Sequence, residues 1–337
     1  MMAEMLAAAP ASNVAPLLSV RDLHVHFKVR GQGRPWAPAA ALKAVNGISF
    51  ELRRGETLGI VGESGCGKST LARALLNLVP STSGSIAWDG NEMVGASAAK
   101  WLALRQHAQM VFQDPLASLN PRMNVAQIIG EPLRTHRPGI SSAELLTEVK
   151  AVMARVGLNE SQIYRYPHEF SGGQCQRIGI ARALILKPKV IVCDEPVSAL
   201  DVSIQAQIIN LLKELQVEMG LALIFIAHDL AVVRHVSQRV LVMYLGRAME
   251  LADKKALYAE PRHPYTRALL SAVPIADPIK ERGKVIDLLQ GDLPSPLSPP
   301  SGCVFRTRCP MARQRCADEV PALRQVGSGS LAACHFA

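Results

Sequence analysis

The stretch Gly62-Glu63-Ser64-Gly65-Cys66-Gly67-Lys68-Ser69 decides the fold class of this chain. It fits the pattern G-x-x-x-x-G-K-[S/T], in which glycines let backbone N–H groups close around a polyphosphate. Thr57–Val61 before it is patterned as a buried strand and Thr70–Leu76 after it as a helix, so the positive end of a helix dipole would face a bound anion. A glycine-rich turn without a ligand is the plainer alternative, which this context disfavours. The sequence therefore predicts an ATP or GTP site, with Lys68 on the β- and γ-phosphates and the Ser69 hydroxyl on Mg²⁺.

Length, composition and charge limit the possible classes of protein. The 337 residues, 49% of them hydrophobic, suffice for one large domain with an appendage. The longest strongly apolar stretch, Leu221–Ala227, is too short to span a bilayer, and residues 1–16 lack the basic region of a secretory signal. We therefore expect a flexible tail over residues 1–16 and a cytoplasmic protein. The net charge of +9 is scattered without an aromatic-interleaved basic motif, which favours a solvated surface or an anionic membrane face over a nucleic-acid partner.

Patterns along the chain predict an α/β core that is interrupted by helices. Leu17–Lys28 and Leu42–Leu52 are patterned as strands on either side of a Gly/Pro-rich loop. Residues from about 97 to 175 carry mostly helical patterning and indicate a helical insertion. The core resumes at Lys189–Cys193, a continuous apolar run that is typical of a parallel sheet buried on both faces. From residue 255 to 337 the sequence is Pro-rich, basic and cysteine-bearing, which predicts an appendage after a main domain over residues 17–254.

The apolar strand Val190–Glu195 ends in two carboxylates. At the carboxyl end of a strand beside a phosphate loop, Asp194 can hold Mg²⁺ through water and Glu195 can polarise an attacking water. A strand followed by an acidic turn is the commoner cause of such a pattern. Because the run follows a phosphate loop and Pro196 stops the strand, the catalytic interpretation is favoured.

A second glycine turn, Ser171-Gly172-Gly173-Gln174, precedes the helical pattern Cys175–Leu186. Such a turn exposes backbone donors and a hydroxyl to an anion, although an ordinary capped helix start has the same sequence. With these motifs in this order, the chain resembles the ATP-binding cassette (ABC) family over most of residues 17–250. The resemblance implies an α/β P-loop core of the RecA type, with an antiparallel β subdomain and a helical subdomain. It also implies that this turn is the signature, which contacts the γ-phosphate of nucleotide bound on a partner subunit.

The resemblance assigns roles to further residues. Gln113 is similar to the family's Q-loop glutamine, Ser198–Asp201 to the D-loop at the dimer interface, and His228 to the switch histidine on the γ-phosphate. Phe27 lies about where the family has an adenine-stacking aromatic residue, although a core phenylalanine would have the same pattern. The predicted catalytic residues are Glu195, His228 and Gln113; the predicted Mg²⁺ ligands are Ser69, Gln113 and Asp194; and the predicted nucleotide contacts are Phe27, Gly62, Glu63, Ser64, Gly65, Cys66, Gly67, Lys68, Ser69, Thr70, Gln113, Ser171, Gly172, Gly173, Gln174, Asp194 and Asp201.

Four cysteines gather in the last tenth of the chain. Cys303, Cys309, Cys316 and Cys334 have the spacing C-x5-C-x6-C-x17-C. In a cytoplasmic protein, such clustering points to a metal more than to disulfides. Four thiolates suit zinc or an iron–sulfur cluster, and the absence of close C-x2-C pairs favours iron–sulfur, with zinc and unmetallated thiols as alternatives. His335 is a possible substitute ligand.

The region beyond residue 255 indicates which subfamily of ABC proteins the chain resembles. His263-Pro264-Tyr265-Thr266, Leu293–Pro296 and Cys303–Cys316, together with Phe112–Arg122, resemble the ATPase subunits of oligopeptide and dipeptide importers, above all those of the F type. This resemblance covers nearly the whole chain beyond residue 17, and in some members the extension carries a four-iron cluster. It implies an ATPase on the cytoplasmic face of a bacterial inner membrane. Its partners would be a second, related ATPase, two membrane-spanning permeases and a periplasmic peptide-binding protein, with residues 113–132 docking a permease helix.

Several alternatives stay open at the level of sequence. A cassette ATPase acting on ribosomes or DNA usually carries two cassettes or a long coiled-coil insertion, and neither is present. A redox-linked regulator could be built on the cysteine cluster. Within transport, the cargo could be oligopeptide, dipeptide, glutathione, nickel or haem, because no residue of this chain is expected to touch the cargo.

Overall fold

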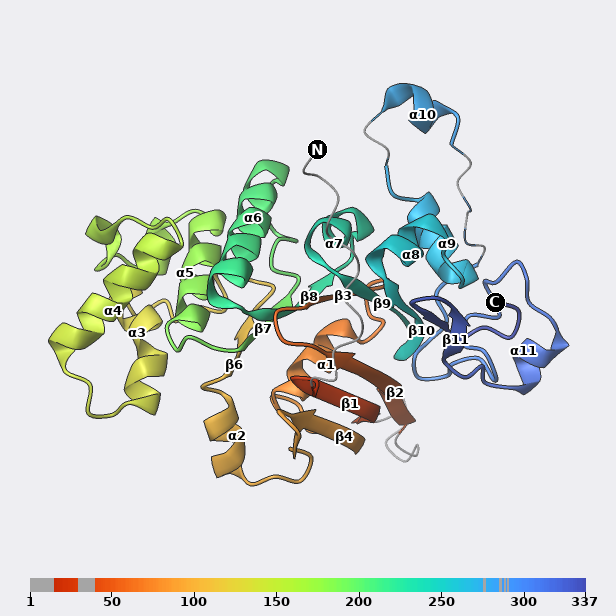
Figure 1. Ribbon diagram of the computed structural model, residues 1–337, viewed down its shortest axis with the longest axis horizontal. Helices are drawn as coiled ribbons and strands as arrows, with labels where there is room; N and C mark the ends of the chain where they lie inside the picture. The colour runs from red at the N-terminus through yellow and green to blue at the C-terminus, as the bar shows by residue number, and fades with distance from the viewer. Residues whose placement is uncertain (1–14, 30–39, 275–276, 285–286, 288, 290) are drawn as a thin grey trace, which may run out of the picture.

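Two β-sheets organise the chain (Figure 1). The computed structural model describes residues 15–29, 40–274, 277–284, 287, 289 and 291–337. The smaller sheet has the strand order β2-β1-β4-β5, and the larger one has the order β11-β12-β10-β9-β3-β8-β7-β6. Residues 1–14 of the predicted tail, and the predicted Gly/Pro-rich loop, lie outside the described residues.

The smaller sheet is antiparallel throughout and forms the expected β subdomain. Val25, Ile48 and Ile86, from three of its strands, pack in one core with Leu71 of α1 (Lys68–Leu75). Strands that face solvent on one side and a core on the other alternate polar and apolar residues, as these do in part. The strands are β1 (Leu18–Val29), β2 (Ala40–Leu52), β4 (Ser83–Trp88) and β5 (Asn91–Glu92).

The larger sheet is parallel through its centre. Every residue of β3 and of β7 is buried, and alternate residues of β7 pack into two different cores, with Ile191 on one face and Val192 on the other. Continuous apolar runs suit strands that are covered on both faces. The parallel strands are β3 (Thr57–Val61), β6 (Ala108–Val111), β7 (Val190–Asp194), β8 (Ala222–Ala227) and β9 (Arg239–Tyr244).

The helices of the main domain follow the strands. The helices α3, α4 and α5 pack on one another, with Ile129, Val149 and Ile178 in a shared core, and lie together at one end of the molecule in Figure 1. The helices are α2 (Ala98–Leu104), α3 (Val125–His136), α4 (Ser142–Arg155), α5 (Gly172–Leu184), α6 (Val202–Met219) and α7 (Leu230–Val236), with 3₁₀ turns at Glu160–Gln162 and Pro167–Glu169.

The structure divides the predicted helical insertion. The sequence predicts mostly helix from about 97 to 175, but β6 lies inside this range and pairs in parallel with β7. A four-residue strand offers too short an apolar run to be distinguished from a helical segment by pattern. The return of β6 to the main sheet has a consequence for the site, because it carries Gln113 to the same sheet edge as the residues that follow β7.

The region beyond residue 255 extends the main sheet rather than forming a separate appendage. The strand β12 (Ser330–Ala332) pairs with β10 (Arg247–Asp253), and β11 (Arg324–Gly327) pairs with β12, all antiparallel. Between β10 and β11 the chain forms α8 (Lys254–Ala259), α9 (Pro264–Ser271), α10 (Pro278–Arg282) and α11 (Gln314–Asp318). The chain beyond β10 therefore adds β12 and β11 at one edge of the sheet that carries the phosphate loop.

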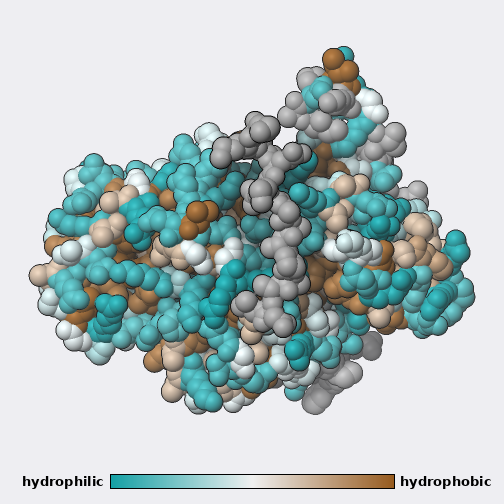
Figure 2. Space-filling model, viewed as in Figure 1, coloured by the Kyte–Doolittle hydropathy of each residue, from teal (hydrophilic) through white to brown (hydrophobic). Residues whose placement is uncertain are grey.

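Within the described residues, no helix is both long enough and apolar enough to cross a membrane. Figure 2 shows hydrophilic and hydrophobic residues intermixed over the visible face.

Candidate nucleotide-binding site

The phosphate loop joins β3 to α1 and needs its glycines. Gly67 has φ +103°, and a Cβ there would lie 2.0 Å from the Ala44 carbonyl oxygen. At Gly62 a Cβ would lie 2.2 Å from the Met243 carbonyl oxygen. Gly67 is also the N-cap of α1, where no side chain caps the helix. The first backbone N–H groups of α1 are therefore left for another acceptor, as an anion site requires.

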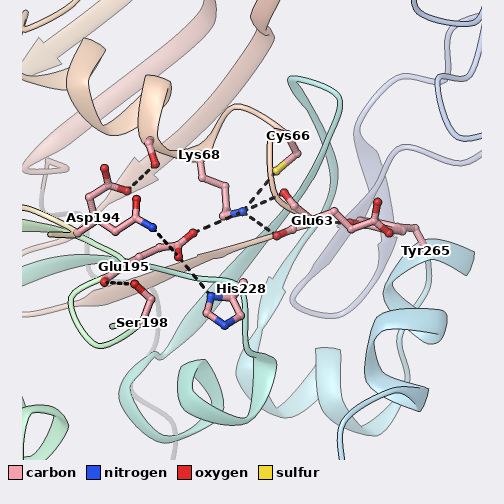
Figure 3. A network of polar contacts seen from close by, with 11 residues as sticks. Glu63, Cys66, Lys68, Asp194, Glu195, Ser198, His228 and Tyr265 are labelled. Atoms are coloured by element: carbon pink, nitrogen blue, oxygen red, sulfur yellow. Dashed lines mark hydrogen bonds and ion pairs between the residues drawn. The ribbon is translucent and has the colours of Figure 1, made fainter. Parts of the chain in front are cut away.

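Lys68 is buried against the loop. Its ammonium donates hydrogen bonds to the carbonyl oxygens of Gly62, at 2.7 Å, and Glu63, at 3.0 Å. The same nitrogen lies 4.0 Å from a carboxylate oxygen of Glu195 (Figure 3). Only 4% of the Lys68 side chain is exposed, so its charge acts in a partly desolvated environment where it attracts phosphate more strongly than it would in water.

Asp194 and Ser69 form an oxygen pair suited to a hard cation. The Ser69 hydroxyl donates to Asp194 Oδ1 at 2.8 Å, whereas the buried Oδ2 of Asp194 has no hydrogen-bond partner. Burial raises the pKa of the Asp194 carboxyl, so a neighbouring cation would favour its ionised form. Hydroxyl and carboxylate oxygens are the ligands that Mg²⁺ prefers, and the residues present fit the predicted Mg²⁺.

Glu195 lies at the centre of the polar contacts in Figure 3. Gln113 Nε2 donates to Glu195 Oε2 at 3.4 Å, and His228 Nδ1 lies 3.3 Å from the same oxygen. The three residues follow the neighbouring strands β6, β7 and β8, whose carboxyl ends share one edge of the sheet. Glu195 also adopts φ +45°, a conformation that is uncommon outside glycine and that recurs at functional sites. The arrangement suits a carboxylate that holds and polarises a water.

A pocket of about 430 Å³ lies over these groups. Its wall brings together predicted residues from five separate segments of the chain. Phe27 is 37% exposed, which suits a stacking surface better than a core position. The predicted residues that line the pocket are Phe27, Ser64, Gly65, Gly67, Lys68, Ser69, Thr70, Gln113, Glu195 and His228.

Other predicted nucleotide contacts do not line this pocket. Gly62, Glu63 and Cys66 belong to the loop but do not line the cavity, and Asp194 lies behind Ser69, whose hydroxyl donates to it. The signature turn and Asp201 lie outside it as well. Ser171 caps α5 by accepting from the Gln174 N–H at 3.4 Å, and Gln174 reaches back to the Ser171 N–H at 3.0 Å. Ser171 and Gly172 are exposed, whereas Gly173 is buried and Gln174 is half-buried.

The four C-terminal cysteines are free and lie near one another. Cys303 and Cys316 are buried, and Cys309 and Cys334 are half-buried. Burial, together with smaller contributions from the neighbouring Cys316, Cys309 and Cys334, raises the pKa of the Cys303 thiol to about 11. No group of three or more metal-ligating side chains is assembled among the described residues. The prediction of a metallated cluster is therefore not confirmed.

The sequence interpretation missed three residues around this site. Pro296, from the chain beyond residue 255, lines the pocket. Tyr265 and Arg308 bind Glu63 from behind the loop. All three residues belong to segments that the sequence singled out for a resemblance, but nothing in the sequence shows that these segments reach the phosphate loop.

Comparison with known proteins agrees with the architecture and with the motifs. Residues 45–198 match the family described as ABC transporter, and residues 249–316 match the family described as oligopeptide/dipeptide transporter, C-terminal region. The dimeric structure of the ATP-binding cassette MJ0796 bound to ADP and Pi has a TM-score of 0.63 and 26% identity, over 70% of this chain and 98% of that chain. The structure of cbiO1 from Clostridium perfringens has a TM-score of 0.61 and 29% identity, over 73% and 91%.

Curated relatives match over nearly the whole chain. The oligopeptide transport ATP-binding protein OppF of Escherichia coli is 63% identical over 91% of this chain and 92% of the relative. OppF of Haemophilus influenzae is 59% identical over 96% and 98%, and the oligopeptide transport ATP-binding protein AppF of Bacillus subtilis is 52% identical over 97% and 99%. The predicted ABC ATPase fold is confirmed, and the chain belongs to the ABC transporter family, among its ATP-binding subunits of the F type.

Proposed function

We propose that this chain hydrolyses ATP to drive oligopeptide import, as a peripheral subunit on the cytoplasmic face of a bacterial inner membrane. The observation that carries the proposal is the convergence of Lys68, Gln113, Glu195 and His228 on one pocket. The relatives named for oligopeptide transport, and the match of residues 249–316 to an oligopeptide/dipeptide transporter region, support the cargo. We take residues 17–254 as the ABC domain and residues 255–337 as the extension of this importer subfamily.

The side chains have distinct tasks in the proposed hydrolysis. Glu195 accepts a hydrogen bond from the attacking water and polarises it, while Lys68 neutralises charge on the phosphates. Ser69, Asp194 and Gln113 would hold Mg²⁺, which supplies charge stabilisation to the phosphoryl group when it is bound. His228 is 60% exposed and stands at the open side of Glu195, where it can contact a terminal phosphate.

The second half of each site would come from a partner ATPase. Ser171, Gly172 and Asp201 lie outside this chain's own pocket, so they are available to nucleotide held by another subunit. Their exposed position supports pairing with a second ABC ATPase, which we take to be a related but different chain. A periplasmic peptide-binding protein would then act through the permeases and not touch this subunit.

A groove beside the helical bundle supports contact with a permease. A cavity of about 330 Å³ lies between the end of α1, α2, β6 and α3, and Phe112 and Pro132 line it. Leu78 and Leu102 at its wall are 47% and 46% exposed, and exposed apolar residues beside a cavity are typical of an interaction site. Because Gln113 follows Phe112 directly, a permease helix bound in this groove would change the position of Gln113 relative to Glu195.

Gln113→Ala tests this coupling. We expect transport to fall more than ATP affinity, because Gln113 contacts Glu195 and directly follows Phe112, which lines the groove. Transport in reconstituted vesicles and ATP affinity by calorimetry are the two readouts, and exposed Gln314→Ala on α11 is the matched control. Equal losses in both readouts would contradict the coupling role.

For the cysteines, we propose a four-iron cluster held by Cys303, Cys309, Cys316 and Cys334, with zinc as the alternative. Four sulfur donors of one chain suit either group, and the electrostatic interaction of Cys303 with the other three thiols supports their proximity. These thiols must lose protons to bind metal. We assign the group no part in hydrolysis, because none of the four cysteines lines the nucleotide pocket. Iron, zinc and acid-labile sulfide, measured on anaerobically purified protein, distinguish a cluster, zinc and free thiols.

Uptake in cells tests the cargo. Cells lacking this chain, complemented with the wild type or with Glu195→Gln, are given labelled peptides of two to five residues and Ni²⁺. We expect Glu195→Gln to abolish uptake of the longer peptides and to leave Ni²⁺ unchanged, while exposed Glu218→Gln on α6 restores uptake. Selective loss of dipeptide or Ni²⁺ uptake would keep the ATPase role and reject the oligopeptide cargo.

A further inference from the structure

The back of the phosphate loop is held by two residues that lie beyond residue 255. The Glu63 backbone N–H donates to the Tyr265 hydroxyl at 3.0 Å. Both oxygens of the Glu63 carboxylate accept from Nη1 of Arg308, at 3.0 and 2.8 Å. Figure 3 shows Tyr265 approaching Glu63 from the side of the loop opposite Glu195. Backbone and side chain of one loop residue are therefore both bound by the extension.

These two residues are themselves rigidly placed. Tyr265 is fully buried and packs at 4.9 Å from the ring of Tyr244 and 5.3 Å from the ring of Phe305. The guanidinium of Arg308 lies 5.9 Å from the centre of the Tyr244 ring, and its side chain is only 11% exposed. Side chains that are already packed lose little further conformational entropy when they form a hydrogen bond, so Tyr265 and Arg308 can fix the position of the loop.

The negative charge of Glu63 explains why the phosphate loop needs the ion pair with Arg308. The loop collects N–H groups and an ammonium for an anionic ligand, and a free carboxylate in it would repel phosphate or compete for Lys68. The Glu63 carbonyl already accepts from the Lys68 ammonium at 3.0 Å. With its carboxylate on Arg308, Glu63 does not line the pocket. The ion pair thus keeps a negative charge out of the anion site.

We propose that Arg308 and Tyr265 are positioning residues of the nucleotide site, which set the affinity for ATP by fixing Glu63 and with it the phosphate loop. The proposal rests on the function proposed above. It means that the extension after β10 completes the nucleotide site of its own chain. A contact that only stabilised the fold would affect thermal unfolding and leave ATP affinity unchanged.

The test is ATP affinity of the full-length chain, measured by calorimetry beside thermal unfolding. We expect Arg308→Ala to raise the Kd for ATP about tenfold, because a charge-assisted contact is lost and Glu63 is left unpaired. Arg315→Ala is the matched control, since Arg315 pairs with exposed Glu319 on the same extension and should leave the Kd unchanged. The double variant Glu63→Arg with Arg308→Glu should recover most of the affinity.

Tyr265→Phe keeps the test decisive if Arg308→Ala does not fold. It removes one hydroxyl from a buried ring and leaves the Glu63 N–H without its acceptor, so we expect the Kd to rise about threefold. If Tyr265→Phe, and Arg308→Ala where it folds, bind ATP within a factor of about 1.5 of the wild-type affinity, the proposal is overturned even if the unfolding temperature falls. Absence of ATP binding by the wild type would instead reject the proposed function, and the positioning role with it.

Discussion

Two helices of this chain begin at glycine-containing motifs, yet their first turns are used differently. At α1 the N-cap is Gly67 and no side chain caps the helix. At α5 the N-cap is Ser171, which caps its own helix together with Gln174. The start of α1 lies in a pocket beside Glu195, whereas Ser171 is exposed on the surface. The start of α1 therefore forms part of a binding site within this chain, whereas the start of α5 is capped by its own side chains and lies on the surface.

The difference shows how one chain can carry two halves of a site. Uncapped N–H groups in a pocket attract an anion by themselves. In a capped and exposed turn, the side-chain cap already satisfies backbone N–H groups of the helix start. Such a turn contributes to a site only when another surface presents a nucleotide to it. We therefore expect changes near α1 to alter this chain's own behaviour, and changes at α5 to matter only in the assembled ATPase pair.

Glu195→Gln gives the largest expected effect. It removes the carboxylate that polarises water but keeps the size of the side chain, so hydrolysis should fall by about a hundredfold or more. ATP binding should persist, because the Glu195 carboxylate donates no hydrogen bond to the phosphates. Phosphate release by the assembled transporter and calorimetry of the chain measure the two quantities, and turnover within tenfold of the wild type would reject the role.

Gly67→Ala and Gly172→Ala compare the two turns directly. A Cβ at Gly67 meets backbone at 2.0 Å and requires a left-handed residue, whereas a Cβ at Gly172 meets only Leu200 at 3.4 Å. We expect Gly67→Ala to lower the free energy of unfolding by about 2–4 kcal/mol and Gly172→Ala by less than about 1 kcal/mol. Denaturant unfolding measures both. Equal losses would mean that the two turns are under similar strain.

Ser171→Ala tests whether the second turn serves another subunit. In the assembled pair we expect ATPase activity to fall about tenfold, through loss of one hydroxyl contact. The Kd for ATP of the isolated chain should stay unchanged, since Ser171 lies outside its pocket. A change in that Kd would show that the turn acts within its own chain.

A third helix start gives the smallest expected effect. At α9 the ring nitrogen Nδ1 of buried His263 accepts from the Tyr265 N–H at 3.0 Å, and burial lowers the pKa of His263 to about 3. Because the unfolded chain binds this proton near pH 6.5, the stability from the neutral ring is complete above that pH. It is lost as the pH falls toward about 3.

His263→Asn keeps a capping side chain and removes the titration. Between pH 6.5 and 5, we expect the unfolding free energy of the wild type to fall more steeply than that of the variant, by about 1 kcal/mol per pH unit. Thermal unfolding over this range measures the slopes. Parallel slopes would show that another group carries the acid sensitivity.

Much of the site could be predicted because its signals are local. The run from Gly62 to Ser69 carries loop, helix start and chemistry in consecutive residues, and the strand Thr57–Val61 was predicted with the bounds that the structure has. The strand β6 was missed because four residues hold no decisive pattern. The convergence of Gln113, Glu195 and His228 was expected only from the family resemblance, since they follow strands that are distant in sequence.

The sequence by itself determined the phosphate loop, the buried parallel strands and the family, because each depends on residue type at short spacing. Only the tertiary structure decided that the region beyond residue 255 joins the main sheet through β12. It also decided that Arg308 reaches Glu63 across 245 residues. Contacts of that separation leave no periodicity in the sequence, because they depend on how whole elements pack. The contacts of Tyr265 and Arg308 with Glu63 become visible only in the folded chain, where Tyr244, Tyr265 and Phe305 pack together.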